Sequence, residues 1–249
     1  MKKTKLKMRK IIILIIIVIC LVLMVFSIYN IILWLKFNKE NSDIKEQIAE
    51  TVSVKQENNK QKYSVDFKSL KEKNPDTIAY LNINSLNIDY IVVKGDDNSY
   101  YLNHNFSKEY NISGWIFGDY RNKFDGTDKN IIIFGHNIKD GSMFGPLKNV
   151  LDQSWQENKE NLEIILVTEK GQYKYQVFST YSINPECYYI TTEFNNNDEY
   201  AKFLKEIKSR SNFNYSLEVS GNDKILTLSS CFGDSSKRVV IHAKLIENE

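Results

Sequence analysis

The most constraining feature of the sequence is a run of 25 residues without a charge, from Ile11 to Leu35. At 1.5 Å per residue, a helix of this length spans about 37 Å, enough to cross a hydrocarbon core of roughly 30 Å with some tilt. A cleavable signal peptide would have an apolar region of about 7–15 residues followed by a small-residue cleavage site. The exit sequence IILWLKFNKE has no such site. The sequence therefore predicts an uncleaved, single-pass transmembrane anchor over 11–35.

Positive charge is concentrated in front of this run. Residues 1–10 hold six of the seven basic residues in 1–36, and this stretch has no acidic residue. By the positive-inside rule, 1–10 is predicted to be a cytoplasmic tail and the chain from residue 36 onward to lie outside the cell membrane. Residues 37–249 hold 26 basic and 31 acidic residues, a net charge of −5. Such a body gives no sign of the basic face that nucleic-acid binding requires.

A polar segment, 36–63, separates the anchor from the predicted folded body. Ile44, Ile48 and Val52 recur every four residues, which favours a helical stalk, although a solvated linker has the same polar composition. The body is predicted to begin near residue 64 and to run to 249 as one extracellular domain. An apolar content of 42% is enough for a true core in a domain of this size.

Strand signals dominate this body. Its short runs rich in β-branched and aromatic residues are separated by Gly, Asn, Asp and Lys clusters. The eight runs are 78–83, 87–93, 113–120, 130–136, 162–168, 173–183, 224–231 and 238–246. This pattern predicts a mainly β fold, either a closed barrel or a sandwich.

Two helical patterns interrupt the strands, over 143–155 and 198–210. Each places its apolar residues on one face, and Asp198 is available to cap the second helix. The first stripe consists of Met143, Phe144, Leu147, Val150, Leu151 and Trp155, and the second of Tyr200, Phe203, Leu204 and Ile207. Packing on a core is the most common reason for such stripes, so both helices are expected to cover the barrel or sandwich.

The residues that carry chemistry are few. The extracellular part has two cysteines, Cys187 and Cys231, which could form a disulfide or remain free thiols. Of the three histidines, His104 lies in a polar-aromatic loop, and His242 lies inside a strand pattern, where a hydrogen-bonded structural role is expected. His136 follows a buried run and a glycine, so it stands where a strand enters a loop. Cys231 occupies the same kind of position, where reactive groups are often found.

His136, Cys231 and Arg238 form a candidate catalytic group. A free cysteine has a pKa near 8.5 and is mostly protonated at neutral pH, so a neighbouring cation would favour the nucleophilic thiolate. Arg238 cannot act as an acid, but its fork of donors could hold a carbonyl or stabilise an oxyanion. Spacing alone does not establish that the three residues meet. No zinc-ligand spacing, phosphate-binding loop or G-x-S-x-G motif is present, so no metal or cofactor is expected.

The segment TLSSC at 227–231, followed by KRVV at 237–240, resembles the TLxTC…R signature of sortases, the membrane-anchored cysteine transpeptidases of Gram-positive bacteria. The stretch 198–210 resembles the class B insertion between the sixth and seventh strands, and the resemblance covers about 65–249. Ser230 departs from the usual threonine. Other blocks resemble class B sortases: NPDTIAYLNI, NSYYLNHNF, GWIFGDYRN, NIIIFGHN and DGSMFGPLKN.

The resemblance implies an eight-stranded sortase β-barrel with peripheral helices. It implies Cys231 as nucleophile, His136 as general acid and base, and Arg238 as the group that orients the substrate and stabilises the oxyanion. Cys187 is expected to be a free thiol that lines the groove. The residues expected to line the sorting peptide are Asn98, Leu102, Tyr189, Ile190 and Ser229.

The implied reaction is a two-step acyl transfer. Cys231 attacks the carbonyl after the Thr of an NPxT-type sorting signal of a secreted protein, and His136 protonates the leaving amine. An amine of a cell-wall precursor, from lipid II or a peptidoglycan cross-bridge, then attacks the thioester. Two rivals come from other classes. A hydrolytic cysteine peptidase or amidase usually places its cysteine before the histidine, at a helix N-terminus. A membrane-anchored binding module would need no thiol chemistry.

Overall fold

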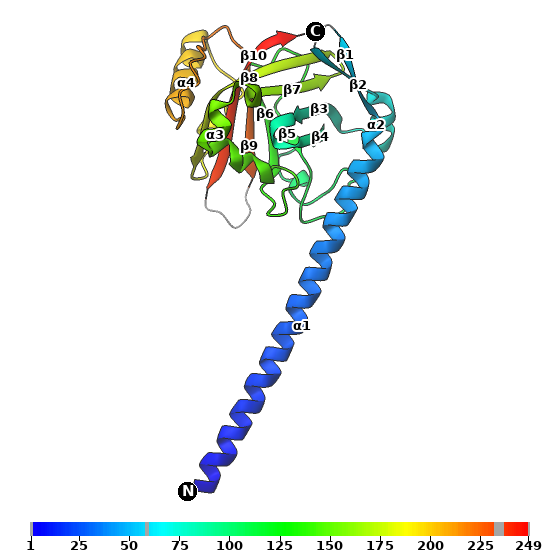
Figure 1. Cartoon of the computed structure of the whole chain (residues 1–249), viewed down its shortest axis with the longest axis vertical. Helices are drawn as coiled ribbons and strands as arrows, with labels where there is room; N and C mark the ends of the chain where they lie inside the picture. Colours follow the sequence, from blue (N-terminus) through cyan, green and yellow to red (C-terminus); the bar gives the residue numbers. More distant parts are fainter. Residues whose placement is uncertain (1, 58–59, 232–236, 249) are drawn as a thin grey trace. The chain divides into compact units, whose positions relative to one another are not determined.

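The computed structural model describes residues 2–57, 60–231 and 237–248, with side chains over 8–57, 61–230 and 237–248. The chain divides into two compact units, Met1–Asp43 and Ile44–Glu249. The first unit is formed by the long helix α1 (Lys2–Ala49), whose last residues belong to the second unit. Figure 1 shows this helix and the β-rich second unit.

Helix α1 contains the predicted anchor. It is the one helix in the described part of the chain that is long and apolar enough to cross a membrane. The side chains of its most apolar window make no buried contacts within the protein. Exposed Ile, Leu, Val and Phe side chains in such number are stable when lipid covers them. The helix is therefore a candidate membrane anchor, in agreement with the run from Ile11 to Leu35.

The segment predicted as a stalk over 36–63 is more varied than expected. The helix ends at Ala49, and the Oγ1 of Thr51 donates a hydrogen bond of 2.6 Å to the carbonyl of Ile48 just beyond its end. An antiparallel hairpin of β1 (Val52–Glu57) and β2 (Lys60–Val65) follows. Ile48 is 4% exposed and belongs to the main core. The compact body thus begins near Ile44, and not near residue 64.

The second unit is built on a closed barrel of eight strands, which confirms the predicted fold. Neighbouring strands follow the order β10-β8-β7-β3-β4-β5-β6-β9, and β9 pairs with β10 to close the barrel. The strands are β3 (Thr77–Ile83), β4 (Ile88–Val93), β5 (Phe117–Gly118), β6 (Asn130–His136), β7 (Glu163–Thr168), β8 (Gly171–Ile183), β9 (Ile225–Cys231) and β10 (Arg238–Asn248).

Strand β5 is much shorter than the run 113–120 that predicted it. Gly114 has a φ of +57°, and a Cβ there would lie 2.4 Å from the carbonyl oxygen of Tyr101. The chain turns at this glycine and joins the barrel for two residues. The residues between Gly114 and β5 are apolar because they are buried. Trp115 is fully enclosed, and its indole N–H donates a hydrogen bond to the carbonyl of Ile91.

Most barrel neighbours are antiparallel, but β6 pairs with β9 in parallel, with residues paired from Asn130↔Ile225 to His136↔Cys231. Parallel strands need a long crossover connection, and here η3, α3, η4, β7, β8, η5 and α4 lie between the two strands. The C-terminal ends of β6 and β9 consequently meet at the same end of the barrel.

The predicted helix over 143–155 is two short helices. A 3₁₀ segment, η3 (Gly145–Leu151), is followed by α3 (Gln153–Glu157), and Asp152 between them is extended, with a ψ of 131°. Most of the predicted apolar stripe is still buried, including Phe144, Leu147 and Trp155. The burial pattern was therefore predicted correctly, and the continuity of the helix was not.

Helix α4 (Asn197–Ser209) matches the prediction for 198–210, but its N-cap is Asn196 and not Asp198. The Asn196 side chain accepts a hydrogen bond of 2.9 Å from the amide of Glu199. Figure 1 shows α4 at the periphery of the second unit, between β8 and β9 in the chain. The remaining short helices are α2 (Phe67–Lys73), η1 (Asn84–Leu86), η2 (Tyr100–Leu102), η4 (Lys159–Leu162) and η5 (Tyr188–Ile190).

The barrel unit contains two apolar clusters. The larger fills the barrel and extends under η3, α3 and the end of α1. The smaller lies between α4 and the outer faces of β8, β9 and β10. Its buried members are Phe178, Tyr181, Tyr189, Tyr200, Phe203, Leu204, Ile207, Ile225 and Val240. Through Tyr189, this second cluster also holds the turn η5.

If residues from Ile44 onward are part of the folded body, Ile48→Ala should lower the free energy of unfolding by about 2–4 kcal/mol, because it removes a buried side chain and leaves a cavity. Val54→Ala is the matched control, since Val54 is 50% exposed on β1. Its effect should stay below about 1 kcal/mol. Thermal or urea unfolding of the two variants measures the difference, and equal stabilities would mean that this segment is not part of the core.

Candidate active site

His136 and Cys231 are brought together by the pairing of two strands. His136 is the last residue of β6 and Cys231 the last of β9, and the two are register partners in the parallel pair. Gly135 precedes the histidine because the strand is closely packed there: a Cβ would lie 2.3 Å from the Cδ1 of Ile116 and 2.8 Å from the Cγ of Phe144. The Cys231 side chain lies outside the described residues, and its backbone position comes from β9.

Arg238 reaches the same end of the barrel from the other side of β9. It is the first residue of β10, which pairs antiparallel with β9 through Val240↔Ser229. The same register, continued by two residues, sets Arg238 level with Cys231. The sequence could not establish that these residues meet, and the topology brings their backbone positions together.

A cavity of about 240 Å³ opens beside these strand ends. Five of the residues singled out from the sequence line it, together with two aromatic residues that were not. The lining residues are Asn98, Leu102, Phe117, Phe134, His136, Ile190 and Arg238. Phe117 and Phe134 come from neighbouring strands and their ring centroids are 5.3 Å apart. In the sequence they look like ordinary core residues, because nothing in an apolar strand pattern separates a core wall from a cavity wall.

The imidazole of His136 is oriented by a backbone carbonyl. Its Nε2 lies 2.6 Å from the carbonyl oxygen of Leu102. A carbonyl can only accept, so Nε2 carries the hydrogen in this arrangement. The bond joins the end of β6 to η2, and both partners line the cavity. A histidine held at one nitrogen in this way is in a defined orientation for proton transfer.

Arg238 is bonded to one buried hydroxyl group, which is itself bonded to a second. Its Nη1 donates a hydrogen bond of 3.0 Å to the phenol oxygen of Tyr189, which in turn lies 2.9 Å from the Oγ of Ser229. Tyr189 and Ser229 are both fully buried. These two residues were expected to line the peptide groove. They are not among the described residues that line the cavity, and Tyr189 instead contacts Arg238.

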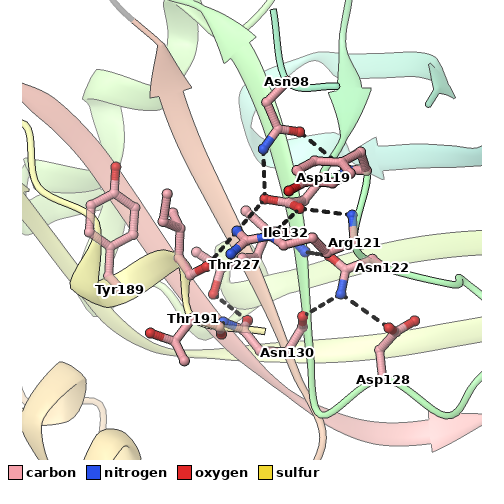
Figure 2. Close-up of polar contacts among 12 residues, drawn as sticks. Asn98, Asp119, Arg121, Asn122, Asp128, Asn130, Ile132, Tyr189, Thr191 and Thr227 are labelled. Atoms are coloured by element: carbon pink, nitrogen blue, oxygen red, sulfur yellow. Dashed lines mark hydrogen bonds and ion pairs between the residues drawn. The ribbon is translucent and has the colours of Figure 1, made fainter. Parts of the chain in front are cut away.

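Asn98 lines the cavity from the segment that follows β4. Its Nδ2 donates to the carboxylate of Asp119 over 2.9 Å, and its Oδ1 accepts from the amide of Tyr120. Figure 2 shows the Asn98 side chain directed at Asp119. Both ends of the amide are therefore engaged, which fixes its orientation.

The remaining candidates lie away from the cavity. Cys187 is an exposed free thiol at the start of η5, so a disulfide with Cys231 is absent and the alternative of a bridge was wrong. Cys187 is also not among the described residues that line the cavity, where it was expected. His104 stacks on Tyr100, with ring centroids 4.0 Å apart, and its Nδ1 lies 2.8 Å from the carbonyl of Tyr100. Over the described residues, no group of His, Cys, Asp or Glu is arranged to hold a metal ion.

His242 has the structural role expected from its strand pattern. Burial, and secondarily the charge of Arg210, lowers its pKa to about 3, so the ring is neutral. Thr227 donates to the Oδ1 of Asn130, so its hydroxyl oxygen accepts from the Nδ1 of His242 at 2.9 Å. The other ring nitrogen, Nε2, then accepts from the hydroxyl of Tyr181 at 2.8 Å. These bonds all run in one direction, an arrangement in which each strengthens the next.

This chain of hydrogen bonds ends at the turn that lines the cavity. The Nδ2 of Asn130 donates to the carbonyl of Thr191 over 2.9 Å, directly after η5. Figure 2 shows Asn130 between Thr227 and Thr191. This network could not be predicted from the sequence, because its members are ordinary polar residues spread over four strands and a loop.

Comparisons with known proteins identify the class that this barrel and site define. The sortase domain family matches residues 81–246. The chain therefore belongs to the sortase family, and its relatives place it among the class B sortases that the sequence resembles. Cysteine transpeptidase activity in cell-wall anchoring is the general function of this family.

The individual relatives agree. Sortase B of Listeria monocytogenes is 37% identical over 188 residues, covering 73% of this chain and 74% of the relative. Sortase B of Staphylococcus aureus is 35% identical over 184 residues, covering 73% and 75%. A crystal structure of sortase B from Bacillus anthracis in complex with AAEK1 superposes with a TM-score of 0.75 at 31% identity, covering 86% of this chain and 99% of that one. Clostridium perfringens sortase B gives 0.69 at 36% identity, covering 73% and 100%.

The burial of His242 predicts a pH dependence of stability. Its pKa is about 3 in the folded chain and near 6.5 when exposed, so the unfolded state binds the proton first as the pH falls. Stability from this group is therefore full above pH 6.5 and is lost as the pH drops towards 3. Between pH 6.5 and about 5 the loss should be roughly 1–2 kcal/mol. Urea unfolding at a series of pH values measures it.

His242→Gln should flatten this slope, whatever it does to stability at neutral pH. His104→Gln is the matched control, because His104 lies in a partly exposed loop and does not belong to the buried network. A slope that changes with His104 and not with His242 would contradict the assignment.

Proposed function

We propose that this chain is a cysteine transpeptidase that cleaves an NPxT-type sorting signal through a thioester on Cys231 and transfers the acyl group to an amine of a cell-wall precursor. The observation that carries the proposal is the register partnership of His136 and Cys231 at the ends of two parallel strands beside a cavity. The NPxT motif and the accepting amine, from lipid II or a peptidoglycan cross-bridge, are inferred from membership of class B.

In the first half-reaction the Cys231 thiolate attacks the carbonyl carbon after the Thr of the sorting signal. The carbon–nitrogen bond breaks, and His136 gives a proton to the leaving amine, so a neutral peptide departs and a thioester remains. The bond from Nε2 of His136 to the carbonyl of Leu102 supports this role, because it orients the ring at the cavity.

Arg238 supplies positive charge to the same step. Arg238 lines the cavity, and its Nη1 donates a hydrogen bond to the hydroxyl of Tyr189. This bond orders the guanidinium before a substrate enters. Donors that are ordered in advance stabilise the negative charge on the carbonyl oxygen without a cost of reorganisation during the reaction. Tyr189 and Ser229 act through Arg238 in this scheme and have no direct contact with the reacting atoms.

The second half-reaction is the reverse chemistry with a different amine. His136 takes a proton from the incoming amine, whose nitrogen attacks the thioester carbon and releases the Cys231 thiolate. Water in place of the amine would make the enzyme a hydrolase, which is the closest rival function. The charge distribution supports an outward-facing site: six basic residues precede the apolar helix, and the positive-inside rule favours a cytoplasmic tail with the barrel outside.

The thioester can be detected directly. The full chain in detergent micelles, mixed with peptides of the NPQTN or NPKTG type, should gain the mass of the peptide up to its Thr residue. The adduct should map to Cys231, disappear with hydroxylamine, and be absent from Cys231→Ala. Intact-mass spectrometry is the measurement.

Adding an amine then separates the two functions. Triglycine or a diaminopimelate-containing peptide should give a joined product in place of the free acid if the enzyme is a transpeptidase. Free acid alone at every amine concentration would support the hydrolase. An adduct on Cys187, or an equal one in Cys231→Ala, would contradict the assignment of the nucleophile.

Arg238→Lys should lower kcat/KM by about 10²–10³-fold, because lysine keeps the charge but loses the rigid fork of donors. Steady-state cleavage of a quenched fluorescent sorting peptide measures the change. Lys244→Arg is the control, because it makes the opposite exchange of basic residues further along β10. The Lys244 ammonium group binds Asp223 outside the cavity, so kcat/KM should not change. Full activity of Arg238→Lys would show that charge alone is needed at this position.

A further inference from the structure

The cavity has two walls that come from distant parts of the chain. Asn98 and Leu102 belong to the segment that follows β4, whereas Ile190 belongs to η5, between β8 and α4. A peptide in an extended conformation that reaches Cys231 would pass between such walls. The distance between them is therefore a property on which substrate binding depends.

A buried carboxylate lies behind the first wall. Asp119 follows β5, its side chain has no exposed area, and it accepts a hydrogen bond of 2.9 Å from the Nδ2 of Asn98. It also accepts two parallel bonds from Arg121, from Nε at 2.8 Å and from Nη2 at 2.7 Å. The amide of Arg121 adds a bond to Oδ1 at 3.0 Å. A bidentate arginine–carboxylate pair of this kind is strong and fixed in direction.

The same guanidinium extends to the second wall. The Nη2 of Arg121 donates to the carbonyl oxygen of Ile190 over 2.9 Å. A continuous chain of hydrogen bonds thus runs from Asn98 through Asp119 and Arg121 to Ile190. Figure 2 shows the carboxylate of Asp119 with Asn98 on one side and Arg121 on the other. The first and last members of this chain line the cavity.

The other hydrogen bonds of the turn at 189–191 connect it to the barrel strands and not to the first wall. The hydroxyl of Tyr189 binds Ser229 and Arg238, and the carbonyl of Thr191 accepts from Asn130. Those bonds join the turn to β6, β9 and β10. The bond from Arg121 to the turn is the one that continues through Asp119 to Asn98.

Holding the loop in shape does not by itself explain the Asp119–Arg121 pair. The loop after β5 has a second carboxylate, Asp128, which accepts bonds from the amides of Lys123 and Phe124 and from the side chain of Asn122. Asp128 therefore organises the loop, and these bonds stay within it. Asp119 instead directs its bonds towards the cavity wall.

We propose that Asp119 and Arg121 are positioning residues that couple the two walls of the peptide groove and set the width at which it accepts a sorting peptide. The inference rests on the proposed function for the identity of the ligand. The pair touches no reacting atom, so its loss should impair peptide binding and leave the chemistry of Cys231 intact. Because the pair joins Asn98 to Ile190, a substitution on either wall should alter the position or mobility of the other wall.

The test uses the full chain in detergent micelles with Arg121→Lys and Arg121→Gln. Lysine leaves a cation beside the buried Asp119, which guards against misfolding, but lacks the fork that reaches both partners. Both variants should raise KM for the sorting peptide about tenfold or more, with kcat within about threefold. The rate at which iodoacetamide alkylates Cys231 should be unchanged, because this small reagent needs no groove.

Amide hydrogen exchange gives a readout that does not require turnover. Both Arg121 variants should exchange faster, by about tenfold, in peptides that cover residues 97–102 and in peptides that cover 188–191. Asp128→Asn is the matched control, since it alters a carboxylate of the same loop and should leave exchange at both walls and KM unchanged. Arg210→Gln is the second control. Arg210 binds Glu186 before η5, so its loss should affect that wall alone.

The outcomes separate this inference from the proposed function. Faster exchange at one wall only, or a fall in kcat with unchanged KM and slower alkylation, would overturn the coupling role. If no peptide is turned over by the wild-type chain, the proposed function fails while the exchange experiment still decides the coupling. An additive effect of Asn98→Ala and Arg121→Gln on KM would also overturn it, because residues that act through one carboxylate must be non-additive.

Discussion

The parallel pairing of β6 with β9 is the constraint on which the rest of the site depends. It aligns His136 with Cys231 because both strands run in the same direction and end together. The antiparallel partner β10 then starts at the same end with Arg238. A shift of one residue in the β6–β9 register would turn one side chain to the opposite face of the barrel. The buried run before His136 and the close packing of Gly135 stabilise the observed register.

A site formed from strand ends needs walls, and these are supplied by loops that the barrel holds in place. Loops tend to be mobile unless their polar groups are bonded to a rigid scaffold. Here each residue of the turn at 189–191 is bonded to another part of the chain. The hydroxyl of Tyr189 accepts from Arg238, and the carbonyls of the next two residues accept from Arg121 and Asn130. Buried, fully bonded networks of this kind rigidify a structure at the cost of strict geometric demands. We therefore expect a substitution at Asn130 or Arg121, neither of which lines the cavity, to alter the turn that does.

Patterns of apolar residues were sufficient to predict the barrel strands, the burial of the 143–155 stripe and helix α4, because burial imposes periodicity directly. The break at Asp152 and the hairpin after Thr51 depend on local hydrogen bonds and packing that periodicity does not record. The group of His136, Cys231 and Arg238 was predicted from residue type and strand-end position, aided by the resemblance to sortases. The Asp119–Arg121 pair was not, since two charged residues in a polar loop have the same appearance whether they face solvent or join two walls.

His136 and His242 show why residue type alone could not assign the site. Both lie on strands of one barrel, and both are bonded through ring nitrogens. His242 is fully enclosed, so burial lowers its pKa until it cannot take a proton in the physiological range. It can only transmit order through Thr227 and Asn130. His136 instead lies at the strand end, where it is partly exposed and lines the cavity. Position within the barrel thus separates the enclosed, structural His242 from His136, which lies at the cavity where the proposed proton transfer would take place.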